Sequence, residues 1–233
     1  MITVLIAHNI REGLSFPGTE NGKYREDDPR FLLLREGLRK MGMPLQADSL
    51  TPDGIDRTDD GKPYFKEIPG IRFNLSHSGD YIACAFSDLE IGLDLQICSA
   101  PHLSVMRIAK RFFTGQEYEA LYTLPPAQDS PRPDNSAPRL DLFYNLWAVK
   151  EACLKYIGCG LRGGMDSFLP DPMPITVFDP ADETNILFRG RIMPNGGSIS
   201  EPAEFALIRA PQGYTMAVCA EKIPEKVMIE TLI

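Results

Sequence analysis

The stretch Trp147-Ala-Val-Lys150-Glu151-Ala-Cys-Leu-Lys155 constrains the fold most, because aromatic and charged residues recur in it with helical spacing. At roughly 100° per residue, these four named residues are expected on one side of a helix. A carboxylate flanked by two ammonium groups and an aromatic ring suits a site for a metal ion and phosphates. The simpler alternative is a surface Glu–Lys pair, which stabilises a helix by about 0.2–0.5 kcal/mol.

An upstream strand offers a partner for this helix. Apolar and polar residues alternate over residues 91–96, so Asp94 and Gln96 are expected on one face, about 6–7 Å apart. Gly92 on the same face would let a bulky ligand approach the backbone. Oxygen ligands without His or Cys favour Mg²⁺, and Glu151 would supply a second carboxylate. The alternative is a solvated aspartate at a strand end.

A third segment places short polar side chains next to a glycine. Ser76, His77 and Ser78 stand directly before Gly79, at the end of an expected strand. Several donors beside a flexible turn suit a phosphate group. The alternative is a histidine that only forms a hydrogen bond within its turn. Together with Asp94, this segment favours a functional site over a surface ion pair.

A basic stripe occupies another expected helix. Arg107, Lys110 and Arg111 are spaced i, i+3 and i+4, and Phe112 and Phe113 follow. Such a stripe usually keeps a helix face in water. In a chain with a formal net charge of −8 it also suits an acidic partner, because complementary charge steers encounter.

Composition narrows the class of protein. The chain has 233 residues, 43% of them hydrophobic, which is enough for one large domain or two small lobes. The negative net charge disfavours a general nucleic-acid binder, and no run approaches the roughly 18 apolar residues of a membrane span. Met1–Ala7 is too short for a signal peptide. Five cysteines without a CxxC pair and three scattered histidines disfavour disulfides or a zinc site, so a cytoplasmic protein is expected.

The residue periodicity predicts a mixture of helices and strands. Helices are expected at residues 30–41, 103–113, 117–121 and 141–157. Strands are expected at residues 3–7, 71–75, 81–86 and 91–95, with further strand-like runs over 167–220. The last three of the four named strands are expected to form an antiparallel meander. The stretch 125–139 contains five prolines and is expected to be a surface loop or insertion.

A faint internal echo suggests two parts. Residues 81–85 (Tyr-Ile-Ala-Cys-Ala) resemble residues 216–220 (Met-Ala-Val-Cys-Ala), and a glycine-containing turn precedes each. Chance similarity between buried strands is one explanation. The other is a pair of similar α+β lobes with a cleft between them. The lobes are then expected at 1–98 and 99–233, the second carrying the helix of Trp147 and Lys155.

Separated motifs occur along the chain in a recognisable order. They are Gly61-Lys-Pro63-Tyr-Phe, Phe73-Asn-Leu-Ser-His77-Ser, Ile91-Gly-Leu-Asp94, and Arg111-Phe-Phe-Thr-Gly-Gln-Glu117 followed by Trp147-x-x-Lys150-Glu151-Ala-x-x-Lys155. This ordered set resembles the 4′-phosphopantetheinyl transferases, specifically the larger, monomeric, surfactin-synthetase-activating (Sfp) type. The resemblance extends over about residues 24–220.

The resemblance implies an α+β fold of two similar lobes related by a pseudo-twofold axis. Each lobe would have a small antiparallel sheet packed on a long helix, with coenzyme A in the cleft. The enzyme would be a monomer that moves the phosphopantetheine arm of coenzyme A to a serine hydroxyl of an acyl or peptidyl carrier protein. Adenosine 3′,5′-bisphosphate would leave. Fatty-acid, polyketide and nonribosomal-peptide carriers all fit.

The resemblance also implies roles for individual residues. Asp94 and Glu151, with Gln96 beside them, would hold Mg²⁺ or Mn²⁺ against the pyrophosphate, while Lys155 would neutralise phosphate charge. The residues implied in coenzyme A binding are Arg25 and Arg30 near the 3′-phosphate, Gly61, Lys62 and Pro63 at the adenine, Ser76, His77 and Ser78 at the phosphates, and Lys150 and Lys155. The carrier protein would dock at the basic stripe and its two phenylalanines.

Gln96 departs from the resemblance, because many relatives have glutamate at this position. An amide offers only a neutral oxygen, so Mg²⁺ is expected to bind more weakly or to keep an extra water. A carboxylate bound to Mg²⁺ is a poorer proton acceptor, so Glu151 is expected to act through a bound water. The alternatives are a Mg²⁺-dependent hydrolase that cleaves the pyrophosphate of coenzyme A or a nucleotide, and a non-catalytic module that binds coenzyme A or a carrier.

Overall fold

The structure is a computed structural model that describes residues 1–8, 24–99, 102–124, 138–175, 183–196 and 203–232. The helices are α1 (Pro29–Lys40), α2 (Pro44–Ser49), α3 (His102–Phe112), α4 (Gly115–Thr123) and α5 (Pro138–Ile157), with 3-10 turns η2 (Pro52–Gly54), η4 (Gly160–Gly163) and η5 (Met165–Ser167). The strands are β1 (Ile2–His8), β2 (Ile55–Arg57), β3 (Pro63–Phe65), β4 (Arg72–Ser78), β5 (Tyr81–Ser87), β6 (Ile91–Ile97), β7 (Phe168–Asp171), β8 (Ile186–Pro194), β9 (Ala203–Ile208), β10 (Tyr214–Ala220) and β11 (Met228–Leu232).

The expected helices are confirmed to within three residues at each end. Most of the expected proline-rich loop, residues 125–137, lies outside the described residues. None of the helices in the described part of the chain is long and apolar enough to cross a membrane.

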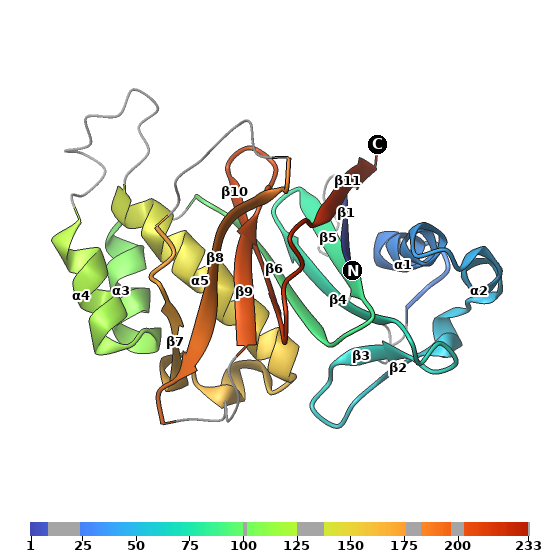
Figure 1. Ribbon diagram of the computed structural model, residues 1–233, viewed down its shortest axis with the longest axis horizontal. Coiled ribbons are helices and arrows are strands. Elements are labelled where there is room, and N and C mark those ends of the chain that lie inside the picture. Colours follow the sequence, from blue (N-terminus) through green and yellow to red (C-terminus); the bar gives the residue numbers. More distant parts are fainter. Residues whose placement is uncertain (9–23, 100–101, 125–137, 176–182, 197–202, 233) are drawn as a thin grey trace.

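Two sheets form the centre of the molecule (Figure 1), besides a short hairpin of β2 and β3. The first sheet has the strand order β11-β1-β5-β4, and the second has the order β6-β10-β9-β8-β7. One buried cluster joins a face of each sheet and contains Val4 and Ala85 from the first and Leu93 and Val218 from the second. Helix α1 covers the other face of the first sheet, and α5 covers the other face of the second. Central strands are therefore buried on both faces, which explains their long apolar runs.

Strand β6 leaves the hairpin that precedes it. Strands β4 and β5 pair antiparallel, but β6 pairs with β10 of the second sheet, so the expected three-strand meander is wrong. Side chains of β4 bridge the two sheets instead. Asn74, Ser76 and Ser78 each accept a hydrogen bond from the backbone N–H nineteen residues later on β6, at 3.0, 3.1 and 2.9 Å. Short polar side chains at alternate positions thus replace one backbone ladder. We call this junction the seam.

The expected α+β class is confirmed, with two differences of detail. The first sheet is not purely antiparallel, because β11 from the end of the chain pairs with β1 in parallel. In addition, β6 and β11 each join the sheet of the other half of the chain. The division at residues 98 and 99 and the pseudo-twofold relation between lobes stay predictions.

Candidate active site

Helix α5 and strand β6 approach each other at Gly92. A Cβ atom built on Gly92 would lie 1.9 Å from the carbonyl oxygen of Ala152 and 2.4 Å from the amide nitrogen of Tyr156. The missing side chain therefore makes room for the helix, which corrects the expectation that it admits a ligand. This close approach brings Asp94, two residues further along β6, against the same helix.

Asp94 lies at the centre of a hydrogen-bonded network. Its Oδ1 accepts a hydrogen bond from Ser76 Oγ at 2.9 Å and from Lys155 Nζ at 2.7 Å. The Lys155 ammonium also donates to Ser76 Oγ and to the carbonyl of Leu93, both at 3.0 Å. The seam, strand β6 and helix α5 are thus joined through one carboxylate and one ammonium group.

The second oxygen of Asp94 faces a different situation. Asp94 is only 5% exposed, and its Oδ2 is buried without a hydrogen-bond partner in the described residues. A buried carboxylate oxygen is costly to leave without a partner, so this atom suits a ligand such as a cation. Glu151 is half-buried nearby. Burial raises the pKa of Glu151, the negative charge of Asp94 raises it further, and Lys155 opposes both effects.

Two neighbouring carboxylates fit Mg²⁺ better than they fit a transition metal. Mg²⁺ is typically held by one or two carboxylates, with water and substrate phosphates completing its shell. Among the described residues, no group of three or more His, Cys, Asp or Glu side chains could hold a metal ion. Asp94 and Glu151 would therefore hold the ion only together with oxygens from a substrate or water.

Gln96 lies further along the same face of β6, beside an apolar pocket. Its Nε2 donates to the carbonyl of Ile97 at 3.1 Å. The pocket has a volume of about 190 Å³, and we call it the aromatic pocket. It is lined by Gln96, Ile97, Ser99, Ile108, Phe143, Tyr144 and Trp147. Metal binding by Gln96 stays a prediction.

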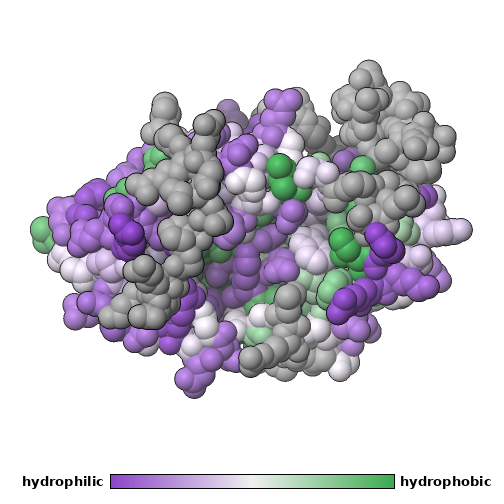
Figure 2. Space-filling view, turned by 180° about the vertical axis from the view of Figure 1, so that it is seen from behind, coloured by the Kyte–Doolittle hydropathy of each residue, from purple (hydrophilic) through white to green (hydrophobic). Residues whose placement is uncertain are grey.

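A second pocket lies between the β2–β3 hairpin and the C-terminal end of α5. It has a volume of about 280 Å³, and we call it the basic pocket. It is lined by Tyr24, Arg30, Arg57, Asp60, Gly61, Lys62, Pro63, Asn74, Leu75, His77, Leu154, Lys155, Gly158 and Gly160. Seen from behind, the surface of the molecule is hollowed near its middle, where hydrophilic residues gather (Figure 2).

Cationic groups dominate the electrostatics of the basic pocket. The Arg30 guanidinium lies 5.4 Å from the centre of the Tyr24 ring and forms an ion pair with Asp28. Partial burial lowers the pKa of His77, and the nearby charges of Lys155 and Arg30 lower it further. Four cations and one carboxylate line the pocket, although three of the cations also pair with carboxylates outside the lining. A lining of this kind suits a ligand that carries phosphate groups.

Lys62 connects the two walls of the basic pocket. Its Nζ donates to Glu90 Oε2 at 2.6 Å and to the backbone carbonyl of Tyr156 at 2.8 Å. Its stem lies against Gly158, which follows the end of α5 with a φ of +87°. The ammonium group is therefore held by the protein, while Gly61, Lys62 and Pro63 line the pocket.

Two residues of the basic pocket, Arg57 and Tyr24, were not predicted from the sequence. Arg57 donates from Nη1 to the carbonyl of Gly61 at 2.8 Å, so it lies across the turn from the predicted residues. Tyr24 faces the pocket beside Arg30. Arg57 precedes the Gly61-Lys-Pro63 motif by only four residues, and this proximity was the one available signal.

Four predicted coenzyme A ligands do not line the basic pocket, and Lys150 is one of them. Ser76 and Ser78 use their hydroxyl groups at the seam, as described above. Arg25 is exposed and pairs with Asp27 at 3.0 Å. The predicted contacts of Ser76, Ser78 and Arg25 with coenzyme A stay predictions.

Lys150 is on a different side of α5 from the site. Its side chain is 0% exposed, and its Nζ lies 2.8 Å from Glu117 Oε1. The ammonium also donates to the backbone carbonyls of Met165 and Phe168. Lys150 lies roughly 140° around the helix from Lys155, so the assumption of one shared side was too generous. A ligand cannot reach this ammonium, which corrects the expectation that Lys150 binds coenzyme A.

The basic stripe is only partly a surface. Arg107, Lys110 and Arg111 are exposed on α3. Phe112 is half-buried against Trp147, and Phe113 is only 6% exposed. Phe113 packs on Phe143 and Trp147 within the core, so its expected contact with a partner is corrected.

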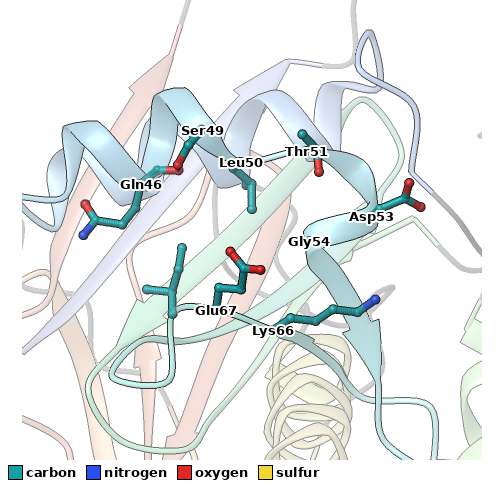
Figure 3. A pocket seen from close by; sticks show the side chains of 9 residues that line it. Gln46, Ser49, Leu50, Thr51, Asp53, Gly54, Lys66 and Glu67 are labelled. Atoms are coloured by element: carbon teal, nitrogen blue, oxygen red, sulfur yellow. The ribbon is translucent and has the colours of Figure 1, made fainter.

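A further pocket lies away from these residues, between α2 and the segment after β3 (Figure 3). It has a volume of about 280 Å³. It is lined by Gln46, Ser49, Leu50, Thr51, Asp53, Gly54, Lys66, Glu67 and Ile68. It contains none of the predicted site residues.

Comparisons with known proteins are consistent with one another. A family model described as the 4′-phosphopantetheinyl transferase superfamily matches residues 90–219. A 4′-phosphopantetheinyl transferase of Bacillus subtilis is 31% identical over 202 residues, which cover 84% of this chain and 76% of the relative. The 4′-phosphopantetheinyl transferase Sfp of Bacillus subtilis (strain 168) is 32% identical over 69% of this chain and 59% of its own length. A putative 4′-phosphopantetheinyl transferase of Synechocystis is 38% identical over 63% of this chain and 56% of its own length.

Proposed function

Because the chain belongs to the 4′-phosphopantetheinyl transferase superfamily and is an enzyme of that class, we propose that it modifies carrier proteins. It would transfer the 4′-phosphopantetheine group of coenzyme A to a serine hydroxyl of an acyl or peptidyl carrier protein. The observation that supports this most directly is the buried Asp94 carboxylate, which Lys155 and Ser76 hold by one oxygen while the other oxygen is left for a ligand.

In this proposal, coenzyme A lies along helix α5. Phe143, Tyr144 and Trp147 line the aromatic pocket, whereas Leu154, Lys155 and Gly158 line the basic pocket. Glu151 lies between the two groups, and the helix rises about 12 Å from Trp147 to Lys155. We place the nucleotide in the basic pocket, the diphosphate beside Asp94 and Glu151, and the pantetheine arm towards the aromatic pocket.

Residues of the basic pocket would bind the nucleotide. Arg30, Arg57 and His77 supply charge and hydrogen-bond donors for phosphate, including the 3′-phosphate. The backbone of Gly61, Lys62 and Pro63 offers a wall for the adenine. Lys155 lies beside Asp94, so its ammonium would offset part of the negative charge that Asp94 and a diphosphate bound there bring together.

The proposed chemistry is a displacement at phosphorus. A bond forms between the serine oxygen and the phosphorus that carries the pantetheine arm, and the bond to adenosine 3′,5′-bisphosphate breaks. Bound Mg²⁺ would supply positive charge beside the diphosphate. Glu151 would take the serine proton through a bound water, since a carboxylate that binds Mg²⁺ is itself a poorer proton acceptor. Lys155 would offset charge on the departing phosphate.

Intact mass spectrometry tests this function. Apo forms of fatty-acid, polyketide and nonribosomal-peptide carriers are incubated with the protein, Mg²⁺ and coenzyme A. A gain of one phosphopantetheine unit on a carrier is the expected result, and its absence from every carrier would contradict the proposal. Release of adenosine 3′,5′-bisphosphate from coenzyme A without any carrier would point to a hydrolase instead.

We further propose that an acidic carrier docks at the exposed part of the basic stripe, Arg107, Lys110 and Arg111. Raising the salt concentration to about 0.5 M should then increase the KM for the carrier, because salt screens exposed charges. An unchanged KM would exclude this surface as the docking site.

We also propose that the protein is cytoplasmic, since five free thiols fit a reducing compartment. We propose in addition that it is a monomer, and light scattering would measure its mass.

A further inference from the structure

One buried ion pair has no part in the proposed chemistry. Lys150 on α5 and Glu117 on α4 are both 0% exposed, with 2.8 Å between Nζ and Oε1. Two rings enclose the ammonium group, with Phe113 at 5.7 Å and Phe168 at 4.7 Å from the ring centre. Replacing such a pair with apolar residues often costs no stability. Stability alone therefore does not explain its presence, and a role in geometry is the alternative.

The pair joins three parts of the chain. Glu117 Oε2 accepts a hydrogen bond from the backbone N–H of Thr114 at 2.7 Å, and Thr114 Oγ1 accepts one from the N–H of Glu117. This capping box starts α4. Lys150 also donates to the carbonyl of Met165 in η5 and to that of Phe168, the first residue of β7. One ammonium group thus connects α5 to α4 and to the segment that leads into the second sheet.

Because Lys150 is next to Glu151 in the chain, the contacts of Lys150 affect the direction in which Glu151 points. Lys150 directly precedes Glu151, and the two side chains diverge by roughly 100° around the helix. On the face of α5 towards β6, Gly92 fixes the distance between helix and strand. On another side of α5, the Lys150 network attaches the helix to α4 and to the segment before β7. It thereby adds to the limits on helix rotation that Lys155 and the buried core already set.

We propose that Lys150 and Glu117 are a positioning pair that sets the rotation of α5 so that Glu151 faces Asp94. The role of Glu151 in this proposal rests on the proposed function. The effect of the pair on the orientation of α5 does not. Neither residue touches substrate, and both act through Glu151. Without the pair, the two carboxylates would share a cation less well.

A neutral double variant tests the proposal. Lys150→Met with Glu117→Gln removes both charges, and the glutamine can still accept from the N–H of Thr114. Mn²⁺ binding in the presence of coenzyme A is measured by electron paramagnetic resonance, beside transfer kinetics. We expect Mn²⁺ affinity and kcat each to fall about tenfold to a hundredfold, with the KM for coenzyme A changed less than about twofold. Unchanged Mn²⁺ affinity in a folded double variant would overturn the proposal.

The controls separate the possible outcomes. Lys40→Met with Glu230→Gln removes an exposed ion pair of 2.7 Å and is expected to change none of these quantities. If the double variant does not fold, Lys150→Arg and Glu117→Asp keep both charges but alter the reach of one side chain. They are expected to weaken Mn²⁺ binding, and full affinity in both would overturn the proposal. A wild-type protein that modifies no carrier would defeat the proposed function, while the Mn²⁺ titration would still judge the pair.

Discussion

Helix α5 carries two lysines that pair with carboxylates in opposite settings. Lys150 and Glu117 are each 0% exposed, whereas Lys155 is 27% and Asp94 8% exposed in the side chain. The carboxylate of Glu117 has the ammonium on one oxygen and the Thr114 N–H on the other. Asp94 has two donors on Oδ1 and, in the described residues, no hydrogen bond on Oδ2.

This difference separates a structural ion pair from a candidate reactive one. Both pairs are charged, both are short, and both join distant segments. Each carboxylate has one buried oxygen without a hydrogen bond in the described residues, but Glu117 Oε1 lies 2.8 Å from the Lys150 ammonium. Only the Lys155–Asp94 pair borders a pocket, through Lys155. An unsatisfied acceptor in a pair that borders a pocket is therefore a better sign of function than the burial of charge alone.

We call the side of α5 that carries Glu151 and Lys155 the open side, and the side that carries Lys150 the closed side. The largest expected effect on activity is on the open side. Glu151→Gln should lower kcat by about 10²–10⁴-fold, because an amide cannot take the serine proton and carries no charge for a cation. The fold should survive, and thermal unfolding would show this. Glu119→Gln on the exposed face of α4 is the matched control. Near-normal turnover by a folded Glu151→Gln variant would remove Glu151 from the proposed chemistry.

Substitutions on the closed side should instead lower the stability of the fold. Lys150→Met leaves Glu117 buried and charged without its partner, which is expected to lower the free energy of unfolding by about 3–5 kcal/mol. Urea denaturation measures the loss. Lys40→Met breaks only the exposed pair with Glu230 and should give no measurable change. If the two variants were equally stable, burial would not make the Lys150–Glu117 pair more important for stability than the exposed Lys40–Glu230 pair.

The electrostatic reach of the two lysines should differ in the same way. Lys155 lowers the pKa of His77, whereas Lys150 is not among the groups that shift it. Removing a positive charge favours the protonated imidazole, so Lys155→Met should raise the pKa of His77 towards its ordinary value. Lys150→Met, measured where the variant stays folded, should leave the pKa of His77 unchanged. NMR titration of the His77 ring decides, and equal responses to both variants would contradict the contrast.

Much of this arrangement could be predicted from the sequence, because it depends on local patterns. The helical spacing around Glu151 predicted α5, and alternation along 91–96 predicted β6 with Asp94 on its polar face. The ordered motifs indicated the family. These features need only neighbouring residues and the periods of helix and strand.

The remaining features depend on tertiary contacts that local patterns do not reveal. The turn after β5 gave no sign that β6 changes sheets, since antiparallel neighbours and exchanged strands have the same short connection. Lys150 looked like part of the site because only packing shows which edge of a helix face is buried. Gly92 looked like an opening for a ligand, whereas the backbone of α5 fills that space.

The smallest expected effect concerns the neutral residue on the open side. Gln96→Glu would add a negative charge two residues from Asp94, which should lower the Mg²⁺ concentration for half-maximal rate by roughly threefold to tenfold, or about 1 kcal/mol of attraction. The gain should be modest because Gln96 also lines the aromatic pocket and donates to Ile97. An unchanged or higher Mg²⁺ requirement would show that residue 96 does not reach the ion. The open side would then consist of Asp94 and Glu151 alone, and the role of Gln96 would be to shape the aromatic pocket.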